Sequence, residues 1–138
     1  MNPNAAKNFI VRNAFLCAAA IAITSCGTAT FSKTGSDARI ESLRSFQLAF
    51  IDEFAVPGKH FNAAAFEAKV NEGNAKFQQA IAEDKFTARR PVLNDLAAQF
   101  KANAAHLRSK ASRGKVTPAL ASEMKKDTNK IYDHALGR

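Results

Sequence analysis

The sequence predicts an all-α protein, an antiparallel four-helix bundle that follows an N-terminal signal and a short tether. Three observations favour this fold class. From Asp37 onward the chain is rich in alanine, and the strict alternation typical of strands is absent. Apolar residues recur there at intervals of three and four in four separate segments. Short turns with proline or glycine separate the segments, which is typical of antiparallel neighbours in a bundle.

The first predicted helix begins at Asp37 and ends before Val56-Pro57-Gly58, because proline and glycine stop a helix. Its apolar side chains recur at helical spacing and therefore share one face. They are Ile40, Leu43, Phe46, Phe50 and Phe54.

The second predicted helix starts near Asn62, a residue type that caps helix N-termini well. Its apolar residues keep one phase across Gly73, which favours a single helix with this glycine on the inner stripe, where a neighbouring helix can approach closely. The alternative is a break at residues 72–74, because glycine inside a helix costs about 1 kcal/mol. The apolar residues are Phe66, Val70, Phe77 and Ile81.

Proline marks the start of the third and fourth predicted helices. Pro91 suits the first turn of the third helix, which ends at Arg113-Gly114. Thr117 is a good N-cap for the fourth helix, and Pro118 occupies its first helical position. The inward residues are Leu93, Leu96, Phe100, Ala104 and Leu107, then Leu120, Met124, Ile131 and Ala135.

The first 26 residues are typical of an export signal. Two basic residues precede an uncharged segment from Ala14 to Thr24, which is shorter than the roughly 20 residues of a membrane-spanning helix. Ile23-Thr24-Ser25-Cys26 resembles the lipobox of bacterial lipoproteins. The resemblance implies cleavage before Cys26, a diacylglyceryl group on its sulfur, and usually an acyl chain on the new amino group. The alternatives are an ordinary cleaved signal and an uncleaved N-terminal anchor.

These assignments divide the chain into a signal peptide (1–25), a lipidated cysteine with a flexible tether (26–36) and a helical domain (37–138). Cleavage would remove Cys17, so the mature chain would form no disulfide. Two or more acyl chains give stable membrane anchoring, since each buried methylene contributes about 0.8 kcal/mol. Gly27, in place of aspartate, follows the cysteine. The lipoprotein resemblance therefore implies a position on the periplasmic face of the bacterial outer membrane.

Charge is distributed unevenly along the chain, whose formal net charge is +8. Residues 37–84 contain eight acids and five bases, giving −3, whereas residues 85–138 contain four acids and twelve bases, giving +8. We therefore expect the two halves to offer faces of opposite charge. The basic half predicts binding to an anionic envelope component, such as lipid headgroups, lipopolysaccharide phosphates or an acidic protein. The alternative is a basic face that is only solvated.

The candidate binding residues form two clusters in the sequence. Arg89 and Arg90 precede the third helix, and the other cluster surrounds the next turn, where exposed backbone amides and long cations together suit phosphate. That second cluster comprises Arg108, Lys110, Arg113 and Lys115. Nucleic acid is not an expected partner, because the chain is assigned to the envelope and no basic motif is interleaved with aromatic residues.

Catalytic signals are weak, and we expect a binding or scaffolding protein without a cofactor rather than an enzyme. The sequence contains neither HExxH nor CxxC, and no pair among His60, His106 and His134 has the i, i+4 spacing of a helical metal site. An enzyme would need a histidine–carboxylate cluster formed by the tertiary structure. The sequence specifies neither the partner nor the oligomeric state.

About the last 28 residues resemble the final hairpin of periplasmic four-helix b-type cytochromes. In that family a Gly-Lys-Val turn leads into a last helix with a haem-ligating histidine near its end. Gly114-Lys115-Val116 matches the turn and His134 matches the ligand, but the family's methionine early in the first helix is missing, since Ile40 and Leu43 occupy that region. The resemblance implies an alternative function, a haem- or metal-binding bundle that uses His134.

Overall fold

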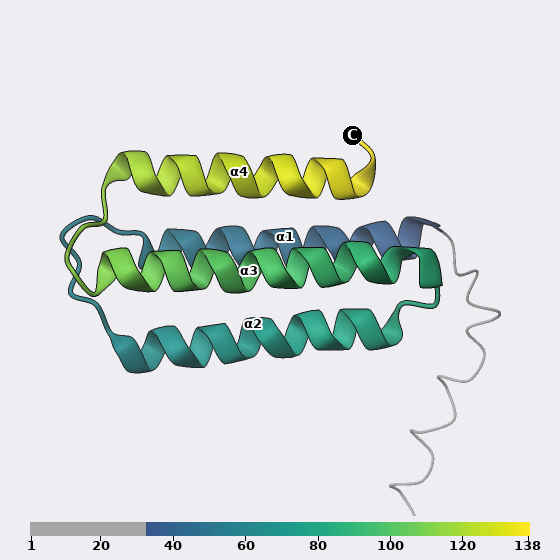
Figure 1. The fold of residues 1–138 in the computed structure, drawn as a ribbon, viewed down its shortest axis with the longest axis horizontal. Helices are drawn as coiled ribbons and strands as arrows, with labels where there is room; N and C mark the ends of the chain where they lie inside the picture. The colour runs from purple at the N-terminus through teal and green to yellow at the C-terminus, as the bar shows by residue number, and fades with distance from the viewer. Residues whose placement is uncertain (1–32) are drawn as a thin grey trace, which may run out of the picture. The chain divides into compact units, whose positions relative to one another are not determined.

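The computed structural model describes residues 33–138 and confirms the predicted fold class (Figure 1). Its elements are α1 (Lys33–Phe54), α2 (Ala63–Glu83), the 3-10 turn η1 (Thr87–Arg89), α3 (Arg90–Ala111) and α4 (Pro118–Leu136). The described part of the chain contains no strand. The predicted signal peptide and Cys26 lie outside the described residues.

The four helices run alternately in opposite directions, so that each is antiparallel to the next along the chain (Figure 1). α1 packs against α4 and α2, and α3 packs against α2 and α4. α1 also contacts α3, whereas α2 and α4 do not touch. The cross-section of the bundle is therefore a rhombus, with α1 and α3 on its short diagonal.

α1 begins at Lys33, before the predicted start at Asp37. Polar contacts that the apolar pattern does not reveal hold this first turn. The buried hydroxyl of Ser36 donates a 2.7 Å hydrogen bond to Asp84, and Asp37 forms a 2.5 Å ion pair with Arg89. Residues 33–36 therefore belong to the helical domain and not to the tether.

α2 is one continuous helix, as predicted, and the alternative break at residues 72–74 is wrong. Asn62 caps it, since its side chain accepts a 3.0 Å hydrogen bond from the amide of Ala65. Gly73 is buried, and a Cβ atom there would lie 2.4 Å from Phe100 Cζ and 2.8 Å from Phe46 Cε1. The glycine therefore allows α2 to approach both α1 and α3.

Phenylalanine fills most of the core. Phe100 is completely buried, and its ring centroid lies 5.4 Å from those of both Phe50 and Phe77. Every residue that the helical spacing predicted to face inward is buried or half-buried. In the second half of α4, however, Tyr132 and Leu136 are buried, each one position beyond the predicted Ile131 and Ala135, which are only half-buried.

The contact between α1 and α4 contains buried polar side chains. Tyr132 donates a 3.1 Å hydrogen bond to the side-chain oxygen of Gln47, and both residues are buried. Arg44 donates hydrogen bonds to Asn129 at 2.8 Å and to Asp133 at 2.9 Å. Burial raises the pKa of Tyr132 well above its ordinary value. This group of hydrogen bonds, rather than apolar contact alone, fixes the register of α4 on α1.

Replacing Gly73 by alanine is expected to destabilise the domain by about 1–3 kcal/mol, because the new methyl group would collide with the Phe100 and Phe46 rings. The loss should appear although alanine favours helix by about 1 kcal/mol over glycine. Urea unfolding measures the change.

Gly35→Ala is the matched control, because Gly35 also lies in a helix but has open space at its Cβ position. This variant should be as stable as the parent or more stable. Equal effects of the two substitutions would contradict the close-packing argument.

The decrease of the unfolding free energy at alkaline pH should depend on Tyr132, which is the only tyrosine in the chain. Because burial raises its pKa in the folded state, its contribution is complete below the unfolded pKa of about 10 and is lost as the pH rises further. The unfolding free energy should fall by up to about 1.4 kcal/mol per pH unit above pH 10 from this group.

Tyr132→Phe should remove this part of the slope, which urea unfolding between pH 9 and about pH 11.5 would show. At neutral pH the same variant should lose about 1–3 kcal/mol, because Gln47 loses its hydrogen-bond partner. Tyrosinate absorbance is a direct check. Ionisation at the same pH in the native and the urea-unfolded chain would contradict the argument.

Candidate functional site

The structure divides the six predicted cationic residues between the two ends of the bundle. Arg89 and Arg90 lie at the start of α3, at the end where α1 begins. The other four surround the turn between α3 and α4, at the opposite end. α3 has 22 residues and is therefore about 33 Å long. The two clusters do not form one surface.

Two of the six arginine and lysine side chains are engaged within the bundle. Arg89 forms its ion pair with Asp37 of α1, and its side chain is only 18% exposed. Arg108 forms an ion pair with Glu67 of α2, and its guanidinium lies 6.0 Å from the centre of the Phe66 ring. Both side chains therefore join helices, and Arg108 also remains exposed, with 53% of its side chain accessible.

Similar ion pairs join α1 to α4 and to the residues that follow it. Asp52 lies 2.7 Å from Lys125 of α4, and Glu41 lies 2.7 Å from Arg138, two residues beyond α4. The acidic first half and the basic second half therefore meet at helix–helix contacts, since α1 packs on α4 and α2 on α3. The expectation that the halves offer faces of opposite charge is wrong for these residues, because their charges are paired across the bundle.

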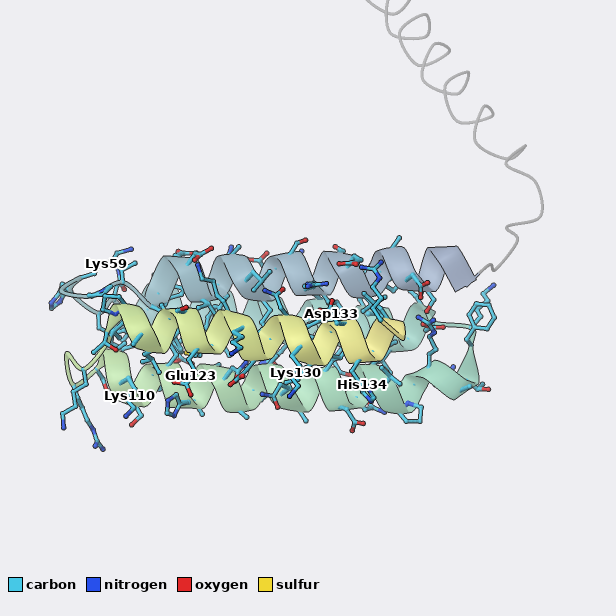
Figure 2. The ribbon with its side chains drawn as sticks, turned by 90° about the horizontal axis from the view of Figure 1, so that it is seen from above. Lys59, Lys110, Glu123, Lys130, Asp133 and His134 are labelled. Atoms are coloured by element: carbon cyan, nitrogen blue, oxygen red, sulfur yellow. The ribbon has the colours of Figure 1, made fainter. Side chains whose placement is uncertain are left out.

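Part of the remaining positive charge gathers where the first and third loops meet, and exposed bases elsewhere include Arg90, Lys101, Lys126 and Lys130. We call residues 53–62 and 109–117 the loop end. It contains four bases, Lys59, Lys110, Arg113 and Lys115, and one acid, Glu53. No ion pair involves these bases within residues 33–138. Figure 2 shows Lys59 and Lys110 at the same end of the bundle, with Glu123 further along α4.

Lys59 is the member of this cluster that the sequence argument missed. It belongs to the acidic half of the chain and is distant in sequence from the other three. The predicted topology could have identified Lys59, because the first and third loops of an up-and-down bundle lie at the same end. Lys59 donates a 3.2 Å hydrogen bond to the backbone carbonyl of Glu53, which holds it close to the end of α1.

The turn between α3 and α4 uses its own backbone amides. Gly114 has a φ of +64°, and its amide donates a 3.0 Å hydrogen bond to Ala111. The amides of Arg113 and Lys115 both donate to the carbonyl of Lys110. The expectation that amides of this turn are available to bind phosphate is therefore wrong. Anion binding at the loop end must depend on side chains.

A cleft of about 390 Å³ opens at the loop end, between the α1–α2 loop and the turn before α4. Its apolar lining includes Phe54, Phe61 and Val116. Lys59 and His60 are among its polar residues, together with Glu53. This volume lies within the range of about 300–1,000 Å³ that is usual for small-molecule sites. The cleft can therefore hold a ligand that has an apolar group next to a negatively charged group.

The three histidines are exposed and lie far apart in the fold. His60 is in the first loop, His106 is on α3, and His134 is near the end of α4. Within the described residues, no group of three histidine, cysteine, aspartate or glutamate side chains is placed to hold a metal ion.

His134 does not fit the haem site that the cytochrome resemblance implies. It follows Tyr132 by two residues, which turns its side chain about 200° away from the buried face of α4. It lines a shallow groove with Gln99, Asp127 and Lys130 on the outside of the bundle. The interior next to it is filled by Tyr132 and other core side chains. This geometry therefore offers no space for a haem group between His134 and the interior of the bundle.

None of the described helices is long and apolar enough to cross a membrane.

Comparisons with known proteins identified no relative of this chain. The chain matches no protein-family model, no curated protein and no solved structure.

Proposed function

We propose that this chain is a bacterial lipoprotein that acts by binding and not by catalysis. Acylated Cys26 holds it at the periplasmic face of the outer membrane, and the loop end of the bundle binds an anionic component of the envelope. One observation supports this most strongly. Once the ion pairs between helices are formed, four bases with a single acid remain together at the loop end.

The topology supports the proposal, because the loop end is opposite to the end where α1 begins (Figure 1). Residues 27–32 can span at most about 21 Å, since an extended chain gains no more than about 3.6 Å per residue. α1 adds about 33 Å for its 22 residues. The loop end can therefore lie up to about 50 Å from the acyl chains, far enough to contact a component other than the anchoring membrane.

The electrostatics favour an anionic partner of low shape specificity. The bases come from two loops and from the end of α3, and they are exposed or half-buried. Exposed charges of one sign raise the local concentration of the opposite ion and accelerate encounter. Such attraction weakens with salt, because the Debye length falls from about 10 Å at 0.1 M to about 3 Å at 1 M.

Lipidation is tested by Cys26→Ser in the full-length chain, expressed in a bacterium with an outer membrane. This variant should remain an unprocessed precursor and lose the mass of the acyl chains, as intact mass spectrometry of the membrane fraction would show. Cys17→Ser is the matched control and should be processed and anchored like the parent. Identical processing of both variants would remove the lipoprotein assignment.

Anion binding is tested by co-sedimentation of residues 27–138 with purified envelopes at low and high salt. This fragment contains every core residue of the described bundle. The parent should sediment at low salt and be released at high salt. Replacing Lys59, Lys110, Arg113 and Lys115 by serine should weaken binding at least tenfold, since each base near an anionic surface contributes about 1 kcal/mol.

The matched control removes the same amount of charge elsewhere, with Arg90, Lys101, Lys126 and Lys130 replaced by serine. These exposed residues lie outside the loop end. The control should keep most of the binding. An equal loss in both variants would show that net charge, and not the loop end, governs association.

A further inference from the structure

We infer that the cleft at the loop end is a binding site for a small organic carboxylate with an apolar body, such as a medium-chain carboxylate. The inference rests on the proposed anion binding and names the chemical class of one ligand. It does not depend on lipidation of Cys26.

The first support is apolar surface that the bundle leaves incompletely covered. Val56 is 38% exposed and is one of only two large apolar side chains that are exposed among the described residues. It lines the cleft together with the half-buried Phe54, Phe61 and Val116. These side chains come from both loops, so they surround one space. An apolar group placed there would gain about 25 cal/mol for each Å² that it buries.

The second support is the charge around this apolar lining. Lys59, His60 and Glu53 line the cleft, and Glu53 is the only acid in the loop end. Lys110, at the end of α3, and Arg113 and Lys115, in the turn, do not line the cleft but neighbour its residues Ala111, Gly114 and Val116, so that the bases outnumber the acid by four to one. A positive surrounding of this kind favours a ligand whose polar end is a carboxylate and disfavours an amine of the same shape.

The third support is the size of the cleft. An α-helix is at least about 10 Å across with its side chains, so a volume near 390 Å³ accepts no more than about one turn. The space is therefore too small to dock a partner helix. It suits a small molecule, whose hydrocarbon part would contact Phe61 and Val116 while its carboxylate lies toward Lys59.

Titration of ¹⁵N-labelled residues 27–138 with octanoate tests the inference. Octanoate should shift amide resonances of residues 56–61 and 114–116 in a saturable way. Acetate, which lacks the apolar body, and octylammonium, which has the opposite charge, should bind at least tenfold more weakly. Equal shifts with octanoate and octylammonium, or no saturable shift at the loop end, would overturn the inference.

Three variants separate the contributions of charge and of apolar contact to octanoate binding, and circular dichroism checks that each variant folds. Lys59→Gln with Lys115→Gln should weaken octanoate binding several-fold, and Val56→Ser should do the same through the apolar part. Glu53→Gln should strengthen binding, because it removes the only negative charge of the loop end. Lys126→Gln, outside the loop end, is the control and should bind octanoate like the parent.

The envelope experiment distinguishes the two proposals. Salt-sensitive sedimentation that depends on the loop-end bases, without octanoate binding, would leave the proposed function intact and remove the ligand class. Octanoate binding without envelope association would support the cleft as a carboxylate-binding site and would overturn the proposed docking on an envelope surface.

Discussion

The bundle depends on the contact between Phe100 of α3 and Gly73 of α2. The Phe100 ring occupies the space that a side chain at residue 73 would need, so the two helices come close together. The same ring packs against Phe50 of α1 and Phe77 of α2. One aromatic side chain therefore joins three helices, and the contact between α1 and α3 across the short diagonal follows from it. Close packing of this kind gives the core a single arrangement.

Ion pairs then reinforce the contacts between neighbouring helices. α1 and α2 each carry one more acid than base, and α3 carries four bases and one acid, whereas α4 carries three of each. Arg108 of α3 pairs with Glu67 of α2, and Lys125 of α4 pairs with Asp52 of α1. Exposed ion pairs contribute only about 0.2–1 kcal/mol each, so these pairs add little to the stability of the bundle. The bases of the loop end form no ion pair among the described residues. Lys110, Arg113 and Lys115 therefore keep their charge available to a partner.

Features that depend on neighbouring residues could be predicted from the sequence, and features that depend on distant contacts could not. The caps at Asn62 and Thr117 and the continuity of α2 at Gly73 follow from local patterns. The start of α1 depends on Ser36 meeting Asp84, far along the chain. The register of α4 depends on Tyr132 meeting Gln47, which an apolar pattern cannot reveal. The site was predicted only in part, because ion pairing with Glu67 or Asp37 depends on helix packing.

The even number of helices decides where a function can reside in this fold. An up-and-down bundle of four helices brings the start of α1 and the end of α4 to one end, together with the second loop, and leaves the first and third loops at the other (Figure 1). Two of the three loops therefore lie opposite to the start of α1, and one loop lies at the same end as this start (Figure 1). The two loops at this end enclose a cleft, which Phe61 of the first loop and Val116 of the third loop both line. The position of the cleft, at the end of the bundle opposite to the start of α1, is thus a consequence of the number of helices.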